Sequence, residues 1–277
     1  MAPFFYAKLP LMTDLIPGIL ALVLYLALAL WQWRSWSALQ AEPPRAAFLG
    51  GSALALCLHG FSVYTLIDTA AGFHFGFFRV ASLIFWVINI TVVASSLRLP
   101  VRSLLSPLFA MTALAIACSL FIDSPYNPHA FSYPLALHIL LSLLAYSMLT
   151  IAAVQAVALS IQDKLLKARQ WQKAMAYLPP LQTMESLLFE MLHAGTSLLA
   201  LSIASGLLFL EDIREQHLAH KMFFSFAALC VYAVLLWGRH ARGWRGRQAI
   251  RWTLGGFVAL MLAYFGTKLV LELLLHR

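Results

Sequence analysis

Long apolar runs, separated by short polar or basic stretches, dominate this chain from end to end. A bilayer core about 30 Å thick is crossed by about 20 apolar residues in helical form. Eight stretches meet that length, at about 15–33, 47–66, 79–97, 102–121, 134–161, 185–210, 222–238 and 252–272. The pattern therefore predicts an all-α protein, a polytopic transmembrane helical bundle of about eight spans.

Composition and loop length support this interpretation. Of the 277 residues, 62% are hydrophobic and 11% are charged, against about 45–50% and 25% in soluble domains. The loops are too short to hold a soluble domain and no internal repeat is visible, so residues 1–277 are expected to form a single transmembrane domain. The fifth run, from Pro134 to Lys164, would be about 46 Å long as a helix, so its end should project beyond the membrane.

The positive charges predict an orientation. Loops after the odd-numbered spans hold thirteen of the 19 lysines and arginines, the other side holds five, and Lys268 lies in the last run. An excess of Lys and Arg marks cytoplasmic loops, so both termini are expected in the periplasm of a bacterium, with the chain in its inner membrane. Five arginines crowd between Arg239 and Arg251, but they are confined to one short turn, so nucleic acid is not a predicted partner.

Catalytic motifs are not apparent in the sequence. No nucleophile and base pair, phosphate-binding glycine loop or H-E-x-x-H motif is present, so we assign no enzymatic reaction. The cysteines Cys57, Cys118 and Cys230 occur singly in apolar runs and are expected to be packing residues.

Two histidines within the spans are the main candidates for function, because ionisable residues are costly inside a membrane. His59 and His138 each lie on a helical face of small and polar residues, which is expected to point into the bundle. Facing each other at similar depth, they could bind a haem iron axially, with Arg79 near the propionates. The alternative is that the histidines only join helices by hydrogen bonds. Arg79 would then be a residue at a helix end whose long side chain reaches the polar surface of the membrane.

Glu190 and His193 form an E-x-x-H pair in the sixth run. A di-iron site would need a second such pair and further glutamates, and the sequence offers none. Interhelical hydrogen bonding is therefore the preferred interpretation of His193.

Several stretches in order resemble the cytochrome c assembly protein family of the CcsA/CcmC type, and within it the short YpjD/HemX-like branch. They are "HILLSLLAYSMLTIAAVQAVAL" from His138, "LPPLQTMESLLFEM", and "GWRGRQAIRWTLGGFVALMLAYFG". The similar region runs over about residues 47–275. The resemblance implies a multi-pass inner-membrane protein that binds or handles haem, and it carries the family's ligand histidines over to His59 and His138.

Two departures from the family limit what the resemblance implies. The tryptophan-rich segment of the full cytochrome c synthases is replaced here by "FLEDIREQHLAHKMFF", which contains no tryptophan. His240 lies nearer to Gly243 and Trp244 than the family's inner histidine does, and His276 is only loosely comparable to the outer partner of His138. The sequence therefore predicts a haem-binding accessory in cytochrome assembly. The alternative is a regulatory subunit of another membrane complex, such as an ion transporter, that binds no haem.

Overall fold

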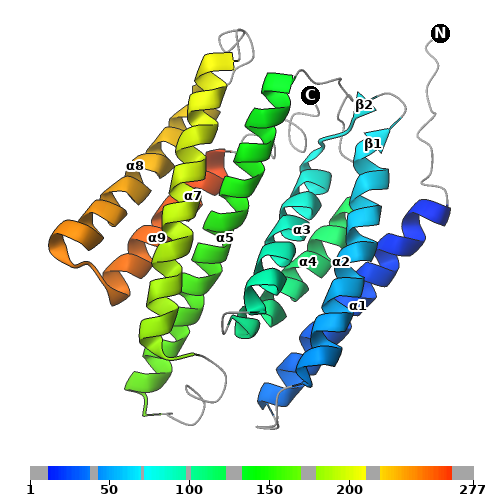
Figure 1. Cartoon of the computed structure of the whole chain (residues 1–277), viewed down its shortest axis with the longest axis horizontal. Coiled ribbons are helices and arrows are strands. Elements are labelled where there is room, and N and C mark those ends of the chain that lie inside the picture. Colours follow the sequence, from blue (N-terminus) through cyan, green and yellow to red (C-terminus); the bar gives the residue numbers. More distant parts are fainter. Residues whose placement is uncertain are drawn as a thin grey trace.

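Eight α-helices make up most of the structure, a computed structural model that describes residues 12–37, 43–69, 72–97, 101–122, 133–169, 179–209 and 219–263 (Figure 1). Seven of the described helices are long and apolar enough to cross a membrane. The helices are α1 (Met12–Ser37), α2 (Arg45–Ile67), α3 (Phe77–Ser96), α4 (Leu105–Phe121), α5 (Tyr133–Lys167), α7 (Leu181–Phe209), α8 (Ala219–Arg242) and α9 (Gly246–Met261). The predicted all-α, multi-pass membrane fold is confirmed.

The eighth expected span, 252–272, begins within α9, and its residues from 264 onward lie outside the described part of the chain. The fifth helix is overlong as expected, since α5 has 35 residues and is about 52 Å long at 1.5 Å per residue. The orientation of the chain in the membrane stays a prediction.

The helices form two four-helix units that lie side by side (Figure 1). In the first unit, α1 and α3 each contact α2 and α4. In the second, α5 and α8 each contact α7 and α9. The units meet mainly where α3 packs against α5, and one continuous cluster of buried apolar residues runs through both.

Three short elements were not expected from the sequence. Between α2 and α3, strands β1 (Asp68–Thr69) and β2 (Gly72–Phe73) form an antiparallel pair in which Asp68 is opposite Phe73. Before α4, the 3₁₀-helix η1 covers Arg102–Leu104. Elements of two or three residues are too short to give a hydrophobic period, so sequence patterns miss them.

Polar side chains inside the bundle are hydrogen-bonded between helices. Asn89 of α3 donates to Thr112 of α4 over 2.6 Å, and the Tyr146 hydroxyl of α5 donates to the Leu260 carbonyl of α9 over 3.1 Å. Buried polar groups without partners are expensive. These bonds therefore fix helix pairs in register where apolar packing alone is non-directional.

Candidate functional site

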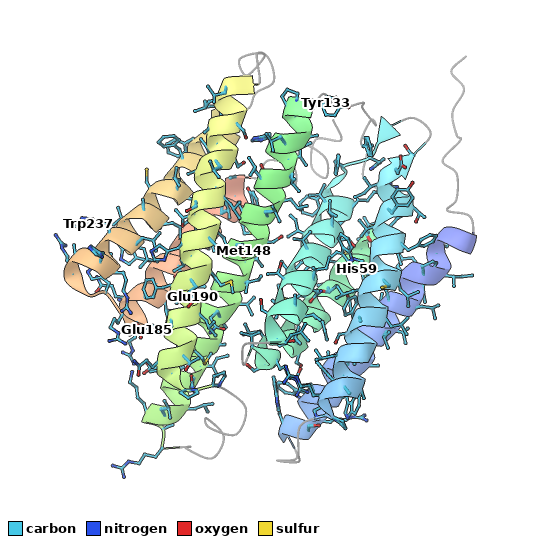
Figure 2. All side chains as sticks on the ribbon, in the orientation of Figure 1. His59, Tyr133, Met148, Glu185, Glu190 and Trp237 are labelled. Carbon is cyan, nitrogen blue, oxygen red and sulfur yellow. The ribbon has the colours of Figure 1, made fainter. Side chains whose placement is uncertain are left out.

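His138 lies near the start of α5, at the end of the molecule where Tyr133 and the β1–β2 hairpin are seen (Figures 1 and 2). Its Nδ1 atom lies 2.9 Å from the Ser202 carbonyl oxygen and 3.2 Å from the Ser205 hydroxyl, both on α7. Ser142, one turn further along α5, pairs with the Ser202 hydroxyl at 2.7 Å. A ladder of three serines thus holds the partly buried ring against α7.

The contact between His138 and α7 is close because Gly206 has no side chain. A Cβ atom at position 206 would lie 3.0 Å from Cε1 of the imidazole. The hydrogen bond also sets the tautomer, because a carbonyl oxygen can only accept. Nδ1 therefore carries the proton, and Nε2 of the neutral ring carries the lone pair.

His59 lies inside the first unit and is fully buried. Its Nε2 atom is 2.9 Å from the Ser82 hydroxyl of α3, and its ring meets Tyr25 of α1 edge-on, with the centroids 5.7 Å apart. Its Nδ1 atom has no hydrogen-bond partner among the described residues. Figure 2 shows His59 among α1, α2 and α3.

The structure does not bring the two histidines together. The ring of His59 contacts side chains of the first unit and that of His138 contacts α7 of the second, and no contact within the described residues joins them. Both rings make the interhelical hydrogen bonds that the alternative interpretation expects.

Arg79 lies in the first turn of α3 and donates to the Leu66 carbonyl near the end of α2, over 2.5 Å. Arg45 does the same at the opposite end of this antiparallel pair, where it donates to the Ser96 and Leu97 carbonyls of α3 at 3.2 and 2.6 Å. Carbonyls at a helix C-terminus lack partners within the helix. The two arginines therefore join α2 to α3 by hydrogen bonds at both ends of the pair.

Of the remaining histidine candidates, two are exposed and one lies outside the described residues. His193 is exposed on α7, and its Nδ1 bonds to the Phe189 carbonyl of its own helix at 2.7 Å. His240 is exposed in the last turn of α8, and His276 lies outside the described residues, as does most of the segment that replaces the tryptophan-rich stretch. Within the described ranges, no group of three or more His, Cys, Asp or Glu side chains could hold a metal ion.

Glu185 is the residue that sequence reasoning missed. It is buried on α7, and its Oε1 atom lies 2.9 Å from both Arg239 and Arg245. These arginines belong to the basic α8–α9 turn, so one carboxylate holds that turn against α7. The only sequence signal is a single acid near the start of the sixth run.

Glycines and tryptophans shape the same turn. Gly243 and Gly246 have φ angles of 65° and 53°, a region that side chains disfavour. Between them, Trp244 stacks on Trp252 with ring centroids 5.4 Å apart. The Gly-Trp-Arg-Gly-Arg stretch is therefore a folded connection held by a buried acid, with its excess arginines on the outside.

Comparison with known proteins gives one family. The family model described as Cytochrome C assembly protein matches residues 47–275. The Inner membrane protein YpjD of Escherichia coli K12 is 34% identical over 230 residues, covering 80% of this chain and 85% of that protein. Protein HemX of Brevibacillus brevis is 23% identical over 210 residues, covering 74% and 70%. No solved structure matches.

The family match covers most of the chain, from the first turn of α2 through α9. The residues that carry the resemblance now also have structural roles: His138 seats α5 on α7, and the Gly-Trp-Arg-Gly-Arg turn joins α8 to α9. This multi-pass membrane protein belongs to the cytochrome c assembly protein family.

Proposed function

We propose that this protein binds haem in the bacterial inner membrane and acts as an accessory in cytochrome assembly, with His138 as an axial ligand. The observation that carries the proposal is the bond from Nδ1 of His138 to the Ser202 carbonyl. Ligand histidines usually donate their other ring N–H to a carbonyl or carboxylate, which orients the ring and raises its basicity. Bound haem would supply an iron atom for Nε2 to coordinate.

His59 and Arg79 complete the proposed haem site as predictions, His59 from the family resemblance and Arg79 from its position at the end of the third predicted span. The atom of His59 that lacks a partner is Nδ1, which leaves one nitrogen of that ring for a ligand. Because His59 lies in the first unit and His138 in the second, a single bis-histidine site would require the two units to shift relative to one another. Arg79 would offer a cation to a propionate at the end of the bundle that holds β1 and β2.

A spectroscopic titration tests the proposal. The detergent-purified protein is titrated with hemin, and the Soret band and binding stoichiometry are recorded for wild type, His138→Ala, His59→Ala and His193→Ala. His193 is the matched control, because its exposed ring also bonds a carbonyl through Nδ1 but lies on the opposite side of α7 from His138. We expect one haem per chain, a changed spectrum in His138→Ala, and a wild-type spectrum in His193→Ala.

The His59→Ala result separates two forms of the site. A low-spin spectrum that is lost in both His59→Ala and His138→Ala supports a pair of ligands, whereas loss in His138→Ala alone supports a single histidine. No saturable binding of hemin, with the protein instead co-purifying with another inner-membrane complex, would contradict the proposal and support the regulatory-subunit alternative.

A further inference from the structure

The outward face of α7 carries a line of polar and small residues, beside the exposed leucines Leu181, Leu201, Leu207 and Leu208 of the same helix. We call this face the α7 stripe, and every residue in it is exposed. It consists of Ser186, Glu190, His193, Ser197, Ala200 and Ala204. These positions recur every three or four residues, so they lie one above another on one side of the helix. On α1 the exposed residues include Ile19, Leu20 and Val23, and on α8 they include Phe223 and Phe226.

Glu190 lies at membrane depth. The span runs over Leu181–Leu208, so Glu190 is about 7 Å from its midpoint at 1.5 Å per residue. No hydrogen bond or ion pair joins Glu190 to another residue in the described part of the chain. An ionisable side chain at this depth normally faces a partner, because lipid tails offer none. Glu185, which Figure 2 also labels, lies five residues earlier on α7 and has two arginine partners.

His193 lies one turn beyond Glu190 and presents a complementary group. Its Nδ1 is bonded to the Phe189 carbonyl, which only accepts, so Nε2 carries the lone pair and can share a proton with a carboxyl group. The stripe therefore contains both halves of a carboxyl–imidazole pair. The two halves belong to the same helix surface, and the structure does not pair them with each other.

From this complementarity of an acid and a base we propose that the α7 stripe is the interface with a second copy of this chain. Two copies inserted in the same orientation and related by a two-fold axis along the membrane normal have identical residues at the same depth. Glu190 of each copy can then meet His193 of the other, about one helical turn away, which forms two equivalent pairs. The small side chains of Ser197, Ala200 and Ala204 allow the two helices to approach closely, as membrane helix interfaces require.

Cysteine cross-linking in native membranes tests the geometry. Cys57, Cys118 and Cys230 are replaced by serine, single cysteines are introduced as Ser197→Cys or Ala204→Cys, and the membranes are oxidised. We expect a disulfide-linked product of twice the 30.8 kDa chain mass from both variants. Val234→Cys on α8 and Leu26→Cys on α1 are controls, since both positions are exposed but lie outside the stripe, and they should give no such product.

Fluorescence energy transfer between labelled copies, measured as they are diluted in liposomes, tests whether Glu190 and His193 hold the two copies together. Glu190→Leu should weaken self-association about five- to tenfold, because two membrane hydrogen bonds are lost per dimer. His193→Leu should match it, and the double variant should be no weaker than either single one. Glu190→Gln, which keeps a hydrogen-bonding group, should fall between wild type and Glu190→Leu. Unfolding of each variant shows whether its fold is intact.

Three outcomes would overturn the proposal. They are a monomer at every lipid dilution, equal cross-linking at the α1 and α8 control positions, or a cross-linked product in which the stripe joins a different polypeptide. Each leaves the haem proposal untouched, because the serine ladder that holds His138 lies on the inward face of α7.

Discussion

The indole ring of Trp244 lies against the backbone of Gly238, in the space that a side chain at position 238 would fill. The Trp244 amide donates to the Gly238 carbonyl over 3.2 Å. This contact folds the basic turn back onto the end of α8. It brings Arg239 and Arg245 within reach of Glu185, so a single glycine makes room for the ion cluster.

Gly238→Ala is expected to destabilise the protein by about 1–3 kcal/mol, because the new methyl group would overlap the indole. The measurement is the free energy of unfolding of the detergent-solubilised protein in a denaturant titration. Gly255→Ala on α9 is the control, since nothing lies within 4 Å of the position its Cβ would take. That variant should be unchanged or slightly more stable. Equal losses in the two variants would contradict the role given to the contact.

Glu185→Ala is expected to lower the free energy of unfolding by about 1.5–3 kcal/mol, the range for hydrogen bonds that involve charged groups. The Glu185 side chain is 7% exposed, and its removal leaves Arg239 without its acid while that side chain is 29% exposed. Asp163→Ala is the comparison, because Asp163 pairs with Lys167 and Arg247 near the end of α5 but is 27% exposed. The loss there should stay below about 1 kcal/mol. A larger loss in Asp163→Ala than in Glu185→Ala would refute this ranking.

Arg79→Ala and Arg45→Ala form a matched pair. Each variant loses charge-assisted bonds to carbonyls at one end of the α2–α3 pair, so both should lose about 1–2 kcal/mol of stability. Only Arg79 is proposed to meet a haem propionate, so only Arg79→Ala should also weaken hemin binding in an absorbance titration. If hemin affinity is the same in both variants and in wild type, the role of Arg79 is confined to closing the helix pair.

Gly206→Ala tests whether the position of the His138 ring matters for haem. The added Cβ would lie 3.0 Å from Cε1 of the imidazole and would push the ring away from Ser202. Gly195→Ala crowds Leu149 in the same α5–α7 contact, with its Cβ 2.7 Å from the leucine Cγ, and does not touch His138. Both variants should be destabilised by about 1–3 kcal/mol, but only Gly206→Ala should change the Soret spectrum of the hemin complex. A spectral change of the same size in Gly195→Ala would show a general effect of helix packing.

The membrane-spanning helices could be predicted from the sequence because their signal is local. A helix that crosses lipid must bond its own backbone groups and present apolar side chains over its whole length, so α1 to α8 are each readable as a run of residues. The same locality explains why β1, β2 and η1 were missed. The Gly-Trp-Arg-Gly-Arg stretch was also readable as a mark of the family, without any indication of its contacts.

Which polar residues meet is a property of the tertiary structure. His59 and His138 have similar small and polar neighbours in sequence, from which the same depth was predicted. In the structure α2 belongs to one four-helix unit and α5 to the other, because helix pairing depends on side-chain packing between segments far apart in the chain. Glu185 and Glu190 differ in burial and in ion pairing for the same reason. They are five residues apart on one helix, but the inward residue meets two arginines more than fifty residues away, while the outward one is left exposed.

The sequence by itself determined that this chain spans a membrane and which family it resembles, because hydropathy and short motifs are local. Only the tertiary structure decided which charges are paired within the chain.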